Sequence, residues 1–262
     1  MKKLTLLLLL VSSFLSAQVE YGKITYLRSS EMTMTFGNDD EEDPGKAAQN
    51  KQIREMMAKM QSSGAFNKTF FATFSPTEFN CMEEYKDPAE MTTDLGGGTT
   101  IMIMSSDEDP MHYYTDTKTG DVLNSDFIFD KGFLVSGNKA RLDWTLTKEK
   151  VAPSEMTAGL DLLLATTITA EGDTLIAGYA PSLPANVGPL NYYGLPGAII
   201  TLEIPNGKNK TVYRATNIEV SSTPLEIAKP TEGKAIKLDK FLEQKAKKEG
   251  MMHRSSSFIE GH

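Results

Sequence analysis

The sequence predicts a mainly β protein, a β-rich α+β domain whose mostly antiparallel sheet carries one inserted helix and one C-terminal helix. Short runs of β-favouring residues recur along the chain, and turn residues separate them at 119–121, 130–132, 171–173 and 206–208. Connections this short favour antiparallel pairing, because a parallel crossover needs about a dozen residues or more. Two other segments place apolar residues at helical spacing. No internal repeat or long linker interrupts residues 18–250, which are therefore interpreted as a single domain.

The N-terminal part of this domain is expected to form a strand followed by the inserted helix. Apolar and polar residues alternate over 19–28, which predicts a first strand with one buried face. The inserted helix is expected over 46–61, because Ile53, Met56 and Met60 recur at helical spacing.

Strand-like runs make up most of the remaining chain. They are expected at 66–74, 79–85, 99–104, 111–115, 122–129, 133–135, 141–147, 158–169, 174–179, 198–204 and 211–220. A loop over 87–98 interrupts them and ends in three glycines. The closing helix is predicted over 238–248, with Leu238 and Phe241 on its apolar face. Residues 251–262 are mostly small and polar, and we predict that they form a disordered tail.

The first 17 residues have the three-part pattern of a secretory signal peptide. Lys2 and Lys3 supply the positive charge, residues 4–11 are apolar, and residues 12–17 are mostly small. The apolar stretch is shorter than the roughly 20 residues that span a bilayer, and no later segment resembles a transmembrane helix. No cysteine follows it that could carry a lipid. The pattern predicts export to the periplasm or the extracellular space, and not as a lipoprotein.

Composition excludes several classes of function. The chain has 262 residues, with 27 Lys and Arg against 35 Asp and Glu, a formal net charge of −8. This acidic balance argues against binding to nucleic acid, because neutralising phosphates needs a basic surface. Cys81 is the one cysteine, which excludes an internal disulfide framework and a cysteine-based zinc site. No metal and no cofactor are predicted.

Catalytic patterns are sparse. A Ser-His-Asp arrangement would have to use His112, and no Gly-x-Ser-x-Gly elbow accompanies it. Neighbouring carboxylates such as Glu83 and Glu84 are typical of solvated charge in an acidic protein, since a working pair needs a pocket that separates the two pKa values. The sequence therefore assigns no catalytic residue, and whether the protein is an enzyme stays open.

The most distinctive stretch spans residues 188–200. A Gly-Pro pair opens it, a Gly-Leu-Pro-Gly turn closes it, and a β-rich run follows from residue 198. Pro196 followed by Gly197 predicts a type II turn with positive φ at Gly197. Of the two tyrosines between the pairs, one is expected to pack and the other to face a ligand. The stretch is either a rigid structural corner or a binding loop. The candidate ligand-binding residues are Tyr192, Tyr193, Leu195 and Pro196, and the candidate structural residues are Gly188, Pro189, Gly194 and Gly197.

This stretch resembles the hallmark of the GLPGLI family, exported proteins abundant in Bacteroidota, with Ala198 where the family usually has leucine. The opening strand over 21–26 and the segment around Trp144 also fit the family pattern, which makes Trp144 a further structural candidate. Leu162 stands where family members often have a cysteine. The resemblance covers nearly the whole mature chain. It implies export, a Bacteroidota source and a curved antiparallel sheet, but no established activity.

Together these observations predict an exported, non-enzymatic binding protein. Its expected partner is another cell-envelope protein, or an apolar or glycan ligand held in the concave side of the sheet. Three alternatives remain at this point: a hydrolase acting on envelope glycans or peptides, an accessory module of such an enzyme, and a carrier of a lipid-like ligand. A distant likeness to bowl-shaped accessory domains of secreted glycan-processing enzymes motivates the second of them.

Overall fold

The computed structural model describes residues 21–31, 51, 54–56, 58–86, 92–94, 100–102, 110–169, 172–206 and 209–259. The predicted signal peptide over 1–17 lies outside these ranges. Among the described residues, no helix is both long enough and apolar enough to cross a membrane.

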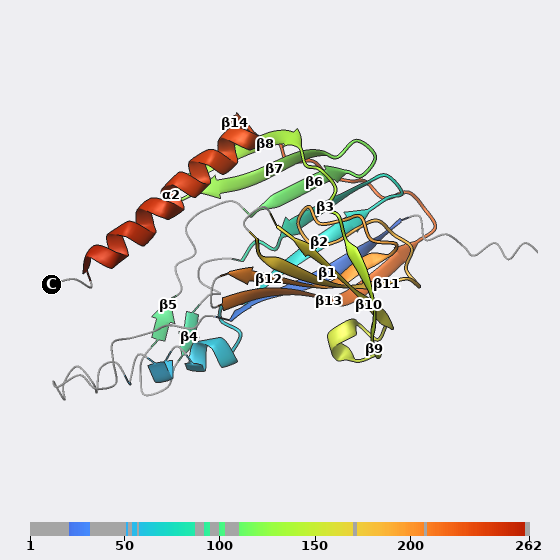
Figure 1. The fold of residues 1–262 in the computed structure, drawn as a ribbon, viewed down its shortest axis with the longest axis horizontal. Helices are drawn as coiled ribbons and strands as arrows, with labels where there is room; N and C mark the ends of the chain where they lie inside the picture. Colours follow the sequence, from blue (N-terminus) through green and yellow to red (C-terminus); the bar gives the residue numbers. More distant parts are fainter. Residues whose placement is uncertain are drawn as a thin grey trace, which may run out of the picture.

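One large sheet dominates the structure and confirms the predicted fold class (Figure 1). Its twelve strands follow the spatial order β14-β8-β7-β6-β3-β2-β1-β13-β12-β11-β10-β9, and every neighbouring pair is antiparallel except β14 with β8. The strands are β1 (Tyr21–Glu31), β2 (Lys68–Phe74), β3 (Glu78–Glu83), β6 (His112–Asp116), β7 (Asp121–Ile128), β8 (Lys131–Asn138), β9 (Thr145–Val151), β10 (Leu162–Ile168), β11 (Thr174–Ala180), β12 (Ala198–Asn206), β13 (Asn209–Ser221) and β14 (Lys234–Lys237). A separate two-stranded sheet pairs β4 (Thr92–Asp94) with β5 (Thr100–Met102).

Several elements differ from the sequence-based expectation. β9 begins at Thr145 and not at residue 141, and β14 was not expected. The run expected over 158–169 forms a strand only from Leu162, and a short 3-10 helix, η2 (Glu155–Thr157), precedes it. β4 lies within the expected loop over 87–98. The inserted helix is present where the chain is described, at residues 51, 54–56 and 58–62.

The C-terminal helix is longer than predicted. α2 spans Leu238–Ile259 and so includes most of the segment predicted to be disordered. No proline follows Leu238 in this segment, and Gly250 alone does not end the helix. α2 contacts β7, β8 and β14, where the Phe241 ring meets that of Phe133 edge to face at 5.8 Å.

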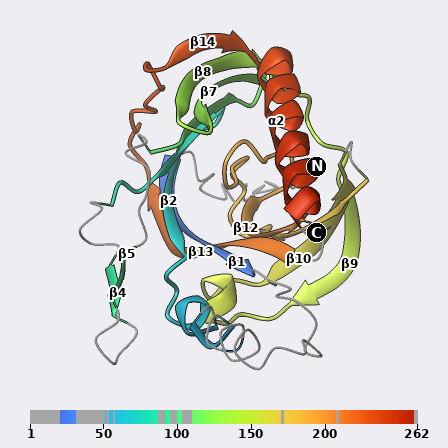
Figure 2. The same ribbon diagram turned by 90° about the vertical axis from the view of Figure 1, so that its left-hand side faces the viewer.

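The sheet is deeply curved, and the core lies on its concave side. In Figure 2 the strands follow a deep curve, and the chain between β11 and β12 lies within it. The inner-face side chains of β1 and β2, such as Ile24, Tyr26 and Phe70, are almost fully buried. They form one hydrophobic cluster with Val187, Leu195 and other residues of the segment between β11 and β12. The apolar residues of the concave side therefore pack against the chain's own loop.

Candidate functional site

Residues 181–197, which we call the inner loop, connect β11 to β12 and fill part of the concave side of the sheet. Backbone hydrogen bonds hold the loop to its own ends: the Ala198 amide donates to the Leu183 carbonyl and the Ile199 amide to the Val187 carbonyl, both at 2.9 Å. The candidate structural residues Gly188 and Pro189 are buried within it. Leu183 and Val187 are buried, and these bonds give their carbonyls the partners that buried backbone groups require.

A buried amide network ties the inner loop to strands β6 and β7. The Asn191 Nδ2 donates to the Thr115 hydroxyl at 2.8 Å and to the Tyr114 carbonyl at 3.3 Å, and its Oδ1 accepts from the Asn124 Nδ2 at 3.0 Å. Asn191 is 5% exposed. Buried hydrogen bonds of this kind specify one position of the loop, because any shift would leave polar groups without partners.

We expect the Asn191→Ala substitution to lower the free energy of unfolding by about 2–3 kcal/mol, because it leaves buried partners on β6 and β7 unsatisfied. Urea denaturation measures the change. The matched control is Asn217→Ala on β13, an exposed asparagine whose side chain donates to the exposed Glu219. That variant should stay within about 0.5 kcal/mol of wild type. Equal losses in the two variants would contradict the anchoring role of Asn191.

A strap over residues 139–144 carries the chain from β8 to β9 and binds residues 193–197, which we call the hallmark turn. The Trp144 indole N–H donates to the Tyr193 carbonyl at 3.0 Å, and the Arg141 guanidinium donates to the Gly194 carbonyl. The Gly194 amide donates in turn to the Asn186 Oδ1 at 2.8 Å. The hallmark backbone is thus held from two sides, by the strap and by the inner loop itself.

The glycines of the hallmark differ from the predicted turn. Gly194 has a φ angle of +105°, a conformation that residues with a side chain disfavour. The φ angle of Gly197, in contrast, is not positive. The predicted type II turn with positive φ at Gly197 is therefore wrong. Gly197 is needed for close approach instead: a Cβ there would lie 2.2 Å from the Ala180 carbonyl oxygen, at the end of β11.

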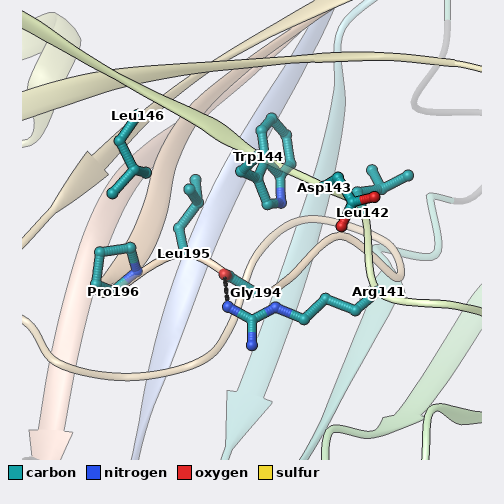
Figure 3. A pocket seen from close by; sticks show the side chains of 8 residues that line it. All are labelled: Arg141, Leu142, Asp143, Trp144, Leu146, Gly194, Leu195 and Pro196. Atoms are coloured by element: carbon teal, nitrogen blue, oxygen red, sulfur yellow. Dashed lines mark hydrogen bonds between the residues drawn. The ribbon is translucent and has the colours of Figure 1, made fainter.

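A pocket of about 540 Å³ opens between the strap and the hallmark turn (Figure 3). It is lined by Arg141, Leu142, Asp143, Trp144, Leu146, Gly194, Leu195 and Pro196. Apolar side chains line part of the pocket, Arg141 and Asp143 add one charge of each sign, and polar surface makes up the larger share of the lining. Of the four candidate ligand-binding residues, Leu195 and Pro196 line this pocket, and Tyr192 and Tyr193 do not.

The two tyrosines have different surroundings. Tyr193 is 5% exposed and its ring packs edge to face against Phe79, with centroids 6.3 Å apart. Tyr192 is only partly buried, and the Lys139 ammonium lies 4.5 Å from its ring centroid. Burial lowers the pKa of Lys139 to about 8. Tyr193 therefore belongs to the core, and Tyr192 stays a candidate at its edge.

Sequence reasoning missed most of the strap. Trp144 was assigned a structural role, and its indole N–H does hold the loop, but its neighbours Arg141, Leu142, Asp143 and Leu146 were not candidates. Their alternation predicted a strand that would start at residue 141. The available signal was the presence of an arginine and an aspartate beside the chain's single tryptophan.

The side chains tested as catalytic candidates do not gather at this pocket. His112 lies on β6, where burial lowers its pKa, and it contributes nothing to the pocket lining. Among the described residues, no group of three or more His, Cys, Asp or Glu side chains could hold a metal ion.

Comparisons with known proteins reveal similarity to solved structures alone. No family model and no curated protein matches the sequence. The structure of PNGF-II aligns with a TM-score of 0.46 at 13% identity, over 87% of this chain. The chain spans only 34% of that protein. An uncharacterized conserved protein from Thermus thermophilus aligns with a TM-score of 0.38 at 7% identity, over 84% of this chain and 91% of that one. Similarities this weak carry no inference about function.

Proposed function

We propose that this chain is an exported, non-enzymatic binding protein of GLPGLI type that recognises a glycan in the pocket between the strap and the hallmark turn. The observation that carries the proposal is the pocket itself, a concave site where apolar side chains and two side chains of opposite charge converge, because small-ligand sites combine apolar walls with a few polar groups that orient the ligand. The signal-peptide pattern and the hallmark motif support the export and the family.

The lining favours a ligand that is apolar on one side and polar on the other. Trp144 is partly buried, and it stands opposite Leu195 in the pocket with its N–H committed to the Tyr193 carbonyl. Leu146 and Pro196 are exposed and lie on the side of the pocket away from Leu142 and Asp143. A sugar ring offers C–H faces to such apolar surfaces and hydroxyl groups to Arg141 and Asp143. The hydrogen bonds that fix Gly194 mean that the site is formed before the ligand arrives, which reduces the entropic cost of binding.

The same lining supports binding over glycoside hydrolysis. Most glycosidases place two carboxyl groups on either side of the scissile bond, one as the acid and one as the base or nucleophile. Among the described residues that line this pocket, Asp143 is the one carboxylate. A lipid carrier receives less support, because the apolar residues of the concave side pack into the core.

Intrinsic fluorescence offers a direct test, because Trp144 is the only tryptophan of the chain and lies in the pocket. We expect oligosaccharide fragments of envelope glycans to shift its emission in a saturable way. The Leu146→Asp substitution should weaken this binding by about tenfold or more, because it removes an apolar wall and adds a charge. The same titration mixtures, analysed by chromatography, should return the oligosaccharide uncleaved.

The matched control is Ile168→Asp, the same kind of change on an exposed strand position outside the pocket. Leu146 is 52% exposed and Ile168 69% exposed, so neither variant should disturb the core. Binding should be unaffected in the control. Cleavage of the oligosaccharide would favour the hydrolase alternative, and saturable binding of a peptide without any response to glycans would replace the glycan by a protein partner.

A further inference from the structure

Arg28 occupies an unusual position on the concave face of the sheet, away from the pocket. It follows Ile24 and Tyr26 on the inward-facing side of β1, which lies between β13 and β2 (Figure 2). Its register partners are Tyr213 on β13 and Lys68 on β2. The side chain is partly buried, so its charge is neither fully solvated nor part of the dry core.

The charges around Arg28 do not balance. Lys68 forms an ion pair with Glu83 at 2.5 Å, and the Glu83 side chain is only 13% exposed. The ion pairs found among the described residues do not include Arg28. Its Nε is buried and has no hydrogen-bond partner in the described chain. Arg28, Lys68 and Glu83 together therefore carry one net positive charge. In addition, burying the Arg28 N–H without a partner costs free energy.

Hydroxyl groups extend the group along the same face. The next inward-facing pair of β1 and β13 is Ser30 and Thr211, whose side-chain oxygens lie 3.3 Å apart. Tyr213 is 5% exposed and packs edge to face on Phe70 at 5.7 Å. Burial raises the pKa of the Tyr213 hydroxyl, and the nearby Arg28 charge opposes that rise. The hydroxyls of Ser30 and Thr211 are neutral groups at the next inward-facing register position after Arg28, whose Nε has no hydrogen-bond partner in the described chain.

We propose that Arg28, together with the hydroxyls of Ser30 and Thr211, binds an oxyanion, the carboxylate or phosphate group of a ligand. A guanidinium matches both groups with two parallel N–H donors, and an anion there would satisfy the Nε and balance the leftover charge. The site shares no residue with the pocket and does not depend on the glycan proposal.

The test compares the full chain with its Arg28→Met variant by thermal unfolding. The probes are sodium phosphate and sodium acetate, each against sodium chloride at equal ionic strength. For wild type, we expect one of the two probes to raise the Tm by about 3–5 °C more than chloride does, at roughly ten times its Kd. Arg28→Met should lose this extra rise, and without the probes it should melt no lower than wild type, because it removes the unpartnered guanidinium.

Two further variants make the result decisive. Arg214→Met is the control: Arg214 follows Tyr213 on β13, so its side chain lies on the opposite face, where it donates to the Met156 sulfur. It should keep the full response and so correct for general stabilisation by phosphate. Arg28→Gln repeats the test should Arg28→Met fold poorly. A response to phosphate alone, or to acetate alone, identifies the anion. Equal responses in wild type and the Arg28 variants, or no response in wild type beyond that to chloride, would overturn the proposal.

Discussion

Replacing Gly197 by valine is expected to lower the free energy of unfolding by about 3 kcal/mol, equivalent to a Tm decrease of roughly 6–12 °C. The cause is the close approach of two backbone segments. A Cβ at residue 197 would lie 2.2 Å from the Ala180 carbonyl oxygen and 2.7 Å from its carbon. Backbone atoms cannot turn aside as a flexible side chain can, so either β11 or the start of β12 must move.

The consequence of such a movement extends beyond the turn. Ala198, Ile199 and Ile200 follow directly and are completely buried, and the Tyr26 hydroxyl donates to the Ile199 carbonyl at 2.7 Å. Displacing the start of β12 therefore disturbs the centre of the hydrophobic core.

Alanine distinguishes this clash from backbone strain. Gly197→Ala already adds the offending Cβ and should cost nearly as much as valine. The control is Gly172→Ala, where φ is +92° but no atom lies within 4 Å of the added Cβ. That variant should lose only about 1–2 kcal/mol, from the left-handed backbone alone. Differential scanning calorimetry on the three variants measures the order of their stability losses. A Gly197→Ala protein as stable as wild type would contradict the packing explanation.

The antiparallel strands could be predicted from the sequence because the signals for them lie within each strand and in the turn beside it. Alternation and turn residues located most strands of the large sheet to within a few residues. β14 was missed because its four residues, Lys234–Lys237, form a short run, and their pairing is parallel to β8, a distant segment. β9 began late because Arg141 and Trp144 bond to the hallmark turn, and this long-range contact outweighs their strand-like alternation.

The candidate site was predictable in part for the same reason. The Gly-Leu-Pro-Gly turn identified one wall of the pocket from sequence alone, through Leu195 and Pro196. The opposite wall comes from residues more than 40 positions earlier in the chain, and nothing local relates the two. Gly197 is similar: a Pro-Gly pair specifies a turn, but the approach of Ala180 that excludes a side chain depends on how β11 and β12 pair.

Truncation of Tyr193 should be the most damaging change in the hallmark. We expect Tyr193→Ala to lower the free energy of unfolding by about 3–5 kcal/mol, as for other large buried aromatic residues, because the ring fills the core beside Phe79. Tyr193→Phe should cost less than about 1 kcal/mol, since the Tyr193 hydroxyl lies a long 3.5 Å from the Lys139 carbonyl. Chemical denaturation of both variants separates the ring from its hydroxyl.

Tyr192→Ala provides the internal comparison, because the two residues are adjacent and chemically identical. Its ring is only partly buried, and its contact with the Lys139 ammonium at 4.5 Å is worth about 0.5–1 kcal/mol. We therefore expect a total loss of about 1–2 kcal/mol, clearly smaller than that of Tyr193→Ala. If Tyr192 serves only to cover the core, Tyr192→Ala will bind glycans with unchanged affinity in the tryptophan titration, since it does not line the pocket. If Tyr192→Ala keeps its fold but loses glycan binding, Tyr192 is part of the binding site. If it loses as much stability as Tyr193→Ala, both rings belong to the core.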